Sequence, residues 1–546
     1  MPIDVSGPRI KSTAAGDGGC RIRKPAVFPA TDPVGEGPRR FRPDSASGSA
    51  RLAMLCCLWF GVSGAATAQT DDERLAEEIR RATAARAEAI PQAARDPYRP
   101  MFHYRPPAQW MNDICGTVFH NGFHHVFYQN NPYSADQYGW GWGHARSKDL
   151  VHWEELPFAL VPMTHRGELR CNSGNVALDA DGKPMIFFTS VPRHGGVRSQ
   201  WAATPLDDDL IRWRRVGDRP IMERGKDGIP GDKVHPSWSD PYLFKKDGRT
   251  FVTFKKAQGM VCEARDPTLT RWTFLGFMAG VAGECPNVFE LGGKCVILRS
   301  THPLSSVIGD LVLTRDSIRF DADGPAVSLD YGFGDRPPED RTKGQTRGFY
   351  GTNAYEDTAG RRILCGWISG FRTGRGWNGC MSLPRILTLD RKNRIVQTPV
   401  PELEALRGAH TRLGRIPLSS EVRLVEGVSG SQLEVVAEFD PGTAGAVGIK
   451  LRCGSDAQRG IVLRFADGVL DVAGTAVPIE PDDAGKTLGL RIFLDHSVLE
   501  VFINGGRKAV TRVEYPDEND LAVAVFAEDG DAIVQSLDAW VLKSIW

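Results

Sequence analysis

Trp110-Met111-Asn112-Asp113 is followed, at 117–128, by Thr-Val-Phe-His-Asn-Gly-Phe-His-His-Val-Phe-Tyr, and this segment has the pattern of a β-hairpin. Asn-Gly between two runs of β-prone residues is a strong short-range signal for two strands joined by a tight turn. Asp113 precedes the Asn121-Gly122 turn by eight residues. The pattern therefore predicts that Asp113 lies at the start of a strand.

The same arrangement recurs four more times along the chain. In each case a residue stands seven or eight positions before a glycine turn: Ser173 before Asp181-Gly182, Asp240 before Asp247-Gly248, Glu284 before Gly292-Gly293 and Gly351 before Ala359-Gly360. Repeats of this kind, built of short strands, are typical of a β-propeller. Because the turns lie 45 to 67 residues apart, we expect five blades with long loops.

Three of the five equivalent positions are carboxylic acids, namely Asp113, Asp240 and Glu284. If each belongs to the innermost strand of its blade, all three face the propeller axis at one end. A single acid before a turn would be interpreted as a solvated turn residue. Three acids at one register instead indicate a catalytic funnel.

Composition excludes several classes of protein. The 546 residues are enough for two or three domains, and 67 basic residues balance 67 acidic ones, which argues against a nucleic-acid partner. Three of the eleven cysteines precede residue 69, and the other eight are dispersed singly without metal-ligand spacing. We therefore expect no metal, no cofactor, and buried free thiols more often than disulfides.

The first part of the chain has the features of a targeting segment. Residues 1–50 are rich in Pro, Gly, Ser and Arg, which indicates a disordered leader or a misassigned start. An apolar run at 52–62 is followed by Ala66-Thr67-Ala68, so residues 51–68 are predicted to be a cleavable signal peptide. The expected location is secreted or periplasmic, with no membrane segment after signal removal.

The remaining chain divides into four parts by the spacing of its apolar residues and turns. We expect a helical segment at 69–98, a five-bladed β-propeller at 99–400, a linker at 401–410 and a C-terminal β-sandwich at 411–546. The predicted fold class is thus all-β. Alternating strands expected in the sandwich are 433–439, 461–466, 469–472, 490–494 and 498–503. Asp495 and Glu500 in this part are expected to be strand-edge residues without a catalytic role.

Eight short motifs occur in one order along the chain. They are Trp110-Met-Asn-Asp113, Phe127-Tyr-Gln129, Trp142-Gly-His-Ala145, Ser147-Lys-Asp-Leu-Val-His-Trp153, Ser173-Gly174, Trp238-Ser-Asp-Pro241, Glu284-Cys-Pro286 and Ser382-Leu-Pro-Arg385. Taken together, they resemble glycoside hydrolase family 32, the retaining β-fructofuranosidases that include invertases, levanases and inulinases. The resemblance covers residues 100 to 546.

The resemblance implies roles for the three acids. Asp113 is the expected nucleophile, Glu284 the general acid/base, and Asp240 the group that stabilises the transition state. A retaining glycosidase needs one carboxylate to attack the anomeric carbon and one carboxylic acid to protonate the leaving oxygen. We expect neighbouring anions to raise the pKa of Glu284, because the acid must carry a proton.

Substrate contacts are also implied by the resemblance. Polar contacts are expected from Asn112, Gln129 and Ser173, and an aromatic wall from Trp110 and Trp367. The alternative for each of these residues is a satisfied polar group at a strand end or a core aromatic.

The chain departs from the family pattern at three places. Ile114-Cys115 replaces Pro-Asn after the nucleophile, Gln137 replaces a tryptophan, and Ser239 replaces the arginine that precedes the second acid. The last change removes a fixed cation beside Asp240, which is expected to favour protonation within the trio and to alter how the fructosyl ring is held. The alternative is that another residue, such as Arg170 or His235, fills the role.

The predicted function is a glycosidase that releases fructose from β-fructofuranosides such as sucrose, inulin or levan by double displacement. One alternative is a fructosyltransferase, in which a sugar hydroxyl replaces water in the second step. The other is a non-catalytic fructan-binding propeller, which the absent arginine favours and the intact acid trio opposes.

Overall fold

The computed structural model describes residues 70–281, 283–332, 348–480 and 487–546. The leader expected at 1–50 and the signal peptide expected at 51–68 lie outside these residues. The described chain consists mainly of β-strands and the turns that join them, so the predicted all-β class is confirmed. Within these ranges no helix has both the length and the apolar character needed to cross a bilayer.

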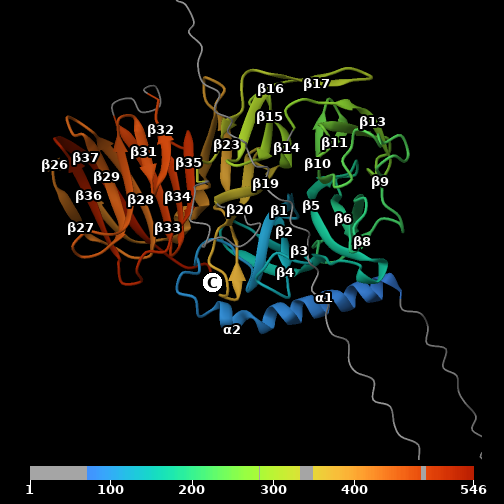
Figure 1. The fold of residues 1–546 in the computed structure, drawn as a ribbon, viewed down its shortest axis with the longest axis horizontal. Helices are drawn as coiled ribbons and strands as arrows, with labels where there is room; N and C mark the ends of the chain where they lie inside the picture. The colour runs from blue at the N-terminus through green and yellow to red at the C-terminus, as the bar shows by residue number, and fades with distance from the viewer. Residues whose placement is uncertain (1–69, 282, 333–347, 481–486) are drawn as a thin grey trace, which may run out of the picture. The chain divides into compact units, whose positions relative to one another are not determined.

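The first described residues form a helix, as the sequence predicts. Helix α1 (Asp71–Glu88) begins with a capping box, in which the Thr70 hydroxyl accepts from the Glu73 amide and the Glu73 carboxylate accepts from the Thr70 amide. The short helix α2 (Ile90–Ala93) follows, with Pro91 in its first turn. Apolar residues of α1 pack on strand β4 (Trp153–Leu160), which lies alongside the helix in Figure 1.

Five mainly antiparallel sheets follow one another within the described part of residues 109–399. Sheet 1 contains β21 (Trp377–Asn378), β1 (Gln109–His120), β2 (Phe123–Asn131), β3 (Gly141–Ser147) and β4. Sheet 2 contains β5 (Glu168–Leu178), β6 (Pro184–Pro192), β7 (Ser199–Pro205), β8 (Trp213–Arg215) and β9 (Met222–Glu223), and the 3-10 helix η1 (Thr164–Arg166) precedes it. Sheet 3 contains β10 (Ser239–Lys246), β11 (Arg249–Lys255), β12 (Met260–Ala264) and β13 (Trp272–Phe277).

Sheets 4 and 5 complete this series. Sheet 4 contains β14 (Glu284–Leu291), β15 (Lys294–Ser300), β16 (Ser305–Leu313), β17 (Ile318–Ala322) and β18 (Val327–Ser328). Sheet 5 contains β19 (Gly348–Glu356), β20 (Arg362–Ser369), β23 (Arg385–Leu389), β24 (Ile395–Pro399) and β22 (Cys380–Met381). All five hairpins expected from the glycine turns are present, as β1–β2, β5–β6, β10–β11, β14–β15 and β19–β20.

The first strands of the five sheets contact one another in a closed cycle. The contacts run from β1 to β5, β10, β14 and β19, and β19 in turn contacts β1. Strand β21, which follows β20 in the chain, pairs in parallel with β1 and joins the end of the series to its beginning. The five first strands therefore surround a common space.

Each first strand carries a register irregularity at the position equivalent to Asp113. The irregularities fall between Met111 and Ile114, Asn172 and Gly174, Ser239 and Tyr242, Glu284 and Asn287, and Tyr350 and Asn353. A β-bulge bends its strand and re-aims a side chain. The expectation that Asp113 begins its strand was wrong, because β1 begins at Gln109; the bulge, and not the strand end, marks the repeated position.

Two further sheets make up the C-terminal part. Sheet 6 contains β25 (Arg407–Leu413), β37 (Asp531–Leu542), β28 (Gln432–Asp440), β33 (Leu488–Asp495), β34 (Val498–Ile503), β35 (Lys508–Val513) and β26 (Ile416–Ser419). Sheet 7 contains β27 (Val422–Ser429), β36 (Ala522–Glu528), β29 (Ala446–Cys453), β30 (Ile461–Ala466), β31 (Val469–Val472) and β32 (Thr475–Pro478). The 3-10 helix η3 (Pro401–Leu406) precedes β25.

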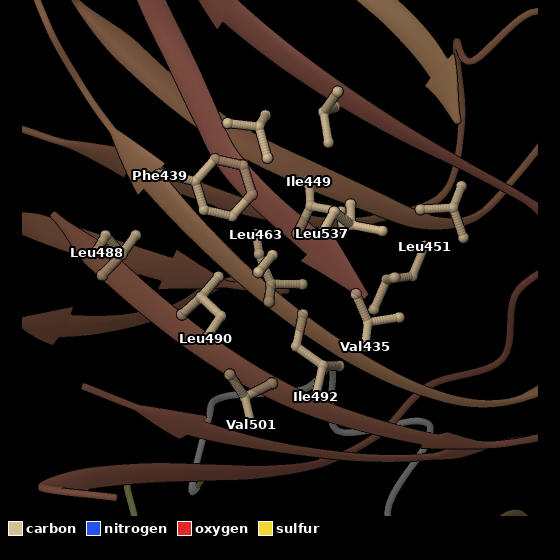
Figure 2. Packing of buried hydrophobic residues seen from close by; sticks show 14 of the residues in the cluster. Val435, Phe439, Ile449, Leu451, Leu463, Leu488, Leu490, Ile492, Val501 and Leu537 are labelled. Atoms are coloured by element: carbon tan, nitrogen blue, oxygen red, sulfur yellow. The ribbon is translucent and has the colours of Figure 1, made fainter. Parts of the chain in front are cut away.

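One hydrophobic core lies between sheets 6 and 7. Phe439 and Leu490 from sheet 6 point toward Ile449 and Leu463 from sheet 7 (Figure 2). The alternation of apolar and polar residues produces this arrangement, since alternate side chains of a strand face opposite sides of a sheet. Each of the five strands expected from this alternation is present, to within two residues at its ends.

A buried network of charges joins sheet 6 to the first five sheets. The guanidinium of Arg385 donates to Glu500 (2.5 Å) and to Asp330 (3.0 Å). His103 lies between Asp495 (2.9 Å) and Glu500 (3.1 Å). The expectation that Asp495 and Glu500 are strand-edge residues was wrong, because both are completely buried at the centre of this network.

The eight cysteines among the described residues are all buried free thiols, as expected from their dispersed positions. Burial raises the pKa of each of these thiols, which favours the less reactive protonated form.

At Gly351, strand β19 passes very close to Asp113 of β1. A Cβ atom at Gly351 would lie 2.3 Å from Asp113 Oδ1 and 2.8 Å from Asp113 Cα, and φ is +51°. Gly360 has a similar φ of +73° but open space around it.

Gly360→Ala should lower the free energy of unfolding by about 1 kcal/mol through backbone strain. Gly351→Ala should lower it by a further 1 to 3 kcal/mol, roughly, through overpacking. Equal effects in denaturant unfolding would contradict the close approach.

His103 makes the stability depend on pH. Burial lowers its pKa, but the bonds to Asp495 and Glu500 raise it by more, to about 9. Since this is above the unfolded value of about 6.5, the stabilisation is complete below that pH and is lost as pH rises toward 9.

We therefore expect the stability of the wild-type protein to fall by about 3 kcal/mol over this interval from His103 alone. His103→Gln should remove that slope in a series of thermal unfolding experiments, whereas His152→Gln, at an exposed histidine that pairs with Asp149, should keep it. Parallel curves for His103→Gln and wild type would contradict a buried charged histidine.

Candidate functional site

The bulges bring the three predicted acids together in the space between the first strands. Asp113 lies on β1, Asp240 on β10 and Glu284 on β14. Cys285 connects them, because its Sγ is 3.3 Å from Asp113 Oδ2 and 3.9 Å from Asp240 Oδ2, and its amide donates to Asp240 Oδ2 (3.2 Å). Glu284 directly precedes Cys285, and its charge acts on both Asp113 and Asp240, so the three carboxyl groups form one cluster.

Backbone strain accompanies this arrangement. Asp240 has a φ of +57° and Cys285 a φ of +41°, values that residues other than glycine adopt at an energetic cost. Both residues lie at the bulges of their strands. The surrounding sheets hold these conformations, which turn the acidic side chains toward one another.

Two of the predicted polar residues position Asp113. The Ser173 hydroxyl donates to Asp113 Oδ2 at 2.7 Å, and Gln129 Nε2 donates to the Ser173 oxygen at 2.6 Å. Ser173 is the residue at the bulge of β5, so the chain of hydrogen bonds runs from sheet 1 through sheet 2 and back to β1. This fixes the orientation of the carboxylate.

Burial of acids near one another shifts their ionisation. Burial raises the pKa of Asp113 to about 6, and the charge of Asp240 adds to this effect, while the Ser173 hydrogen bond opposes it. Burial also raises the pKa of Asp240, although the charge of Lys255 opposes the shift. The two aspartates thus hold protons more strongly than exposed carboxyl groups do.

Glu284 behaves differently from the other two acids. Burial raises its pKa, but the ammonium of Lys255, which contacts Glu284 Oε1, and a hydrogen bond from Tyr350 lower it by more, so the net shift is downward. The expectation that neighbouring anions raise this pKa was wrong, because a cation lies closer than the anions. The Glu284 side chain is 42% exposed, whereas Asp113 is 9% exposed, so solvent reaches Glu284 more readily.

Lys255 lies opposite Ser239, the position at which the sequence differs from the family pattern. The two residues pair directly across β10 and β11, so a positive charge enters from the strand next to the one that carries Asp240. Arg170 and His235 were the alternatives for a substitute cation. Arg170 stacks on Trp140 and His235 bonds to Ser237, whereas Lys255 contacts Glu284 and its charge acts on Asp240.

Trp110, which lies three residues before Asp113 on β1, packs against two further tryptophans. The ring of Trp110 lies 5.2 Å from that of Trp140 and 6.4 Å from that of Trp367, and all three are buried. The indole nitrogens of these residues, together with Asn112 Oδ1 and Gln129 Oε1, have no hydrogen-bond partner within the described chain. Buried polar atoms are nearly always paired in folded proteins.

Sequence reasoning missed Lys255, Tyr350, Cys285 and Trp140. Counting back from the Asp247-Gly248 turn pairs Ser239 with Lys256, and only the bulge shifts the partner to Lys255. Tyr350 directly precedes Gly351, the fifth repeated position, and this proximity was an available signal.

Comparison with known proteins places this geometry in a family. Residues 103–399 match the N-terminal domain of glycosyl hydrolases family 32, and residues 402–541 match the C-terminal domain of the same family. A levanase of Bacillus subtilis (strain 168) is 29% identical over 82% of this chain and 71% of the levanase. A sucrose-6-phosphate hydrolase of Zymomonas mobilis subsp. mobilis is 28% identical over 81% of this chain and 92% of that protein.

Solved structures show the same fold. The crystal structure of fructan 1-exohydrolase IIa from Cichorium intybus matches with a TM-score of 0.68 over 82% of this chain and 98% of that one, at 23% identity. The two family matches together span most of the chain, including all three clustered acids. The chain is therefore a member of glycosyl hydrolase family 32, and it is a glycosidase.

Proposed function

We propose that the protein hydrolyses β-fructofuranosides such as sucrose, inulin or levan and releases fructose with retention of configuration. The observation that carries this proposal is the pairing of a recessed, hydrogen-bonded Asp113 with a solvent-accessible Glu284 in one cluster. The similarity to a levanase and to a sucrose-6-phosphate hydrolase supports a fructoside as the substrate class.

The finer architecture belongs to the same proposal. The closed cycle of first strands supports a five-bladed β-propeller at 99–400, in which sheets 1 to 5 are the blades. The core shared by sheets 6 and 7 supports a β-sandwich at 411–546, joined through the linker at 401–410. The helical segment at 69–98 precedes the propeller. The apolar run at 52–62 with its Ala-Thr-Ala site supports export to the periplasm or the medium.

In the first step, Asp113 attacks the anomeric carbon of the fructosyl unit. Glu284 donates a proton to the departing oxygen, and Asp240 binds hydroxyl groups of the ring and stabilises its developing positive charge. The recessed position of Asp113 suits a nucleophile, because the Ser173 bond aims one oxygen and leaves the other for attack. The exposure of Glu284 suits a residue that meets leaving groups and water.

The protonation states required for this step arise when substrate binds. In the free protein Lys255 favours the ionised form of Glu284, and the raised pKa of Asp113 favours a proton on the Asp113 carboxyl group. A leaving group that separates Glu284 from the ammonium removes the lowering influence, so the pKa of Glu284 rises. Transfer of one proton from Asp113 to Glu284 then prepares nucleophile and acid together.

In the second step, the Glu284 carboxylate takes a proton from water, and the hydroxide attacks the fructosyl-enzyme ester. The ester bond to Asp113 breaks and fructose leaves with its β configuration restored, because two displacements have occurred at one carbon. The polar side chains of Asn112 and Gln129 and the wall of Trp110 and Trp367 hold the sugar in both steps. If a sugar hydroxyl replaces water, the same ester gives fructosyl transfer.

Two substitutions separate the roles of the acids. Asp113→Asn should abolish turnover of every fructoside, because an amide is a very poor nucleophile. Glu284→Gln should slow sucrose cleavage by about 10² to 10⁴, and cleavage of an aryl fructoside with a good leaving group much less, since that group departs without a proton. Asp247→Asn, at an exposed hairpin turn, serves as the matched control.

Product analysis completes this test. Chromatography should give fructose from sucrose and from a fructan, whereas longer oligosaccharides would indicate transfer. NMR of the first product should detect the β anomer of fructose. If the α anomer forms first, the retaining mechanism and the role of Asp113 are rejected.

A second prediction concerns Lys255. Lys255→Gln removes a positive charge beside the cluster, and this raises the pKa of each nearby carboxyl group. Both limbs of the pH profile of kcat/KM should therefore move to higher pH. Lys255→Arg keeps the charge and should leave the profile near that of the wild type. Identical profiles for all three proteins would show that the ammonium does not control ionisation of the cluster.

A further inference from the structure

A cavity of about 480 Å³ lies between helix α1 and the loop that joins β2 to β3. Glu78 and Ala82 of α1 form one wall, and Tyr133 and Tyr138 of the loop form another. Helix α1 precedes residue 103, where the family match begins, so one wall of this cavity is built from a segment outside that match.

One layer of chain separates the cavity from the acid cluster. Gly139 and Gly141 line the cavity, while Trp140 between them packs against Trp110. On β5, Leu169 lines the cavity and the next residue, Arg170, stacks on Trp140 at 4.3 Å. The amide of Trp110 also donates to the carbonyl of Ser134 in the same loop, at 3.2 Å. The loop and β5 therefore form a common wall between the cavity and Trp110, which lies three residues before Asp113 on β1.

The aromatic side chains of this loop are unusually exposed. Tyr133 is 57% exposed and Tyr138 is 64% exposed. Among the Phe, Tyr and Trp residues of the described chain, only these two and Trp546 are classed as exposed. Two exposed rings within six residues, on one wall of one cavity, form an apolar platform with hydroxyl groups at its edge.

The helical wall is held firmly in place. Asp72 pairs with Arg214 at 2.6 Å near the start of α1, and Arg86 pairs with the carboxylate of Glu155 at 2.5 Å near its end. Leu75 and Ala82 are buried against β4. The cavity is thus formed before any ligand binds, which lowers the entropic cost of binding.

The lining defines the chemistry of the ligand. It combines the two tyrosine rings with the carboxylates of Glu78 and Asp136, the guanidinium of Arg193 and the hydroxyl of Thr164. The charged and hydroxyl side chains can donate hydrogen bonds to, or accept them from, the hydroxyl groups of a neutral polyol. The tyrosine rings can pack against its C–H groups. The two carboxylates disfavour an anionic ligand.

We propose that this cavity is a remote saccharide site, which binds sugar units of an oligomeric fructan beyond the unit that leaves the acid cluster. The inference rests on the proposed fructoside hydrolysis and narrows its substrate class, because sucrose is too short to occupy both places. Fructan oligomers are then preferred to sucrose.

The test compares substrates of increasing length on the full chain. The kcat/KM of the wild type should rise from sucrose through the trisaccharide and tetrasaccharide to longer inulin-type and levan-type oligomers. The double variant Tyr133→Ala/Tyr138→Ala should lose about tenfold in kcat/KM on oligomers through a higher KM, equal to about 1.4 kcal/mol. Its kcat/KM on sucrose should change less than twofold.

Two further variants sharpen the result. Thr164→Trp, which fills the cavity from η1, should reproduce the loss on oligomers. The matched control Tyr133→Phe/Tyr138→Phe keeps both rings and should retain the preference. A wild-type kcat/KM that is equal for all lengths, or an alanine variant that loses sucrose and oligomers equally, would overturn the remote site while leaving fructoside hydrolysis intact.

Binding gives a readout that does not depend on turnover. In Asp113→Asn, calorimetry should detect tighter binding of a tetrasaccharide than of sucrose, and the two tyrosine-to-alanine substitutions should remove that difference. Equal affinities with and without the tyrosines would reject the site. Absence of cleavage of any fructoside by the wild type would reject the proposed hydrolysis, and with it the fructan preference.

Discussion

The close approach of five bulged strands is the constraint on which the rest of the structure depends. Each bulge turns one side chain into the space that the first strands share, and that space is so narrow that β19 needs glycine where it passes Asp113. Of the four other positions, three carry acids and one carries Ser173, which holds Asp113 by a hydrogen bond. The geometry of the sheets therefore fixes the geometry of the site.

Gathering three carboxyl groups in a buried place creates an electrostatic conflict. Burial raises the pKa of both aspartates, the charges of neighbouring acids add to this effect, and Lys255 lowers the pKa of Glu284. The lysine comes from β11, directly opposite Ser239 of β10. A cation at this place contacts the third acid and explains why Glu284, the most exposed of the three, has a lowered pKa.

The C-terminal sheets contribute through buried charges. Glu500 accepts hydrogen bonds from the amide of Leu383 (2.7 Å) and from Arg385. One carboxylate of sheet 6 therefore holds the segment that leads into β23 of sheet 5. His103, just before β1, is held by the same network. Breaking a buried pair of this kind by removing one partner typically costs about 3 to 5 kcal/mol. The network thus fixes both ends of the cycle of sheets that surrounds the acids.

The sequence alone determined the features that depend on local rules. Glycine turns between β-prone runs located all five hairpins, strand alternation located the C-terminal strands, and the spacing before each turn selected Asp113, Asp240 and Glu284. These signals survive because turn conformation and side-chain alternation are set by neighbouring residues. Gln129 followed from a motif and Ser173 from both a motif and its spacing, and in the structure Gln129 donates to Ser173, which donates to Asp113.

Only the tertiary structure decided what depends on contact between distant strands. The bulge at Asp240 shifts the partner of Ser239 from Lys256 to Lys255, and no local pattern reveals a shift of one residue. The downward shift in the pKa of Glu284 follows mainly from its contact with Lys255, with a further contribution from the Tyr350 hydrogen bond. The burial of Glu500 and the cavity beside α1 likewise arise from surfaces that meet only after folding. Spacing along the chain specifies which residues repeat. The ionisation of the acids and the shape of the neighbouring cavity depend instead on which strands lie next to each other in space.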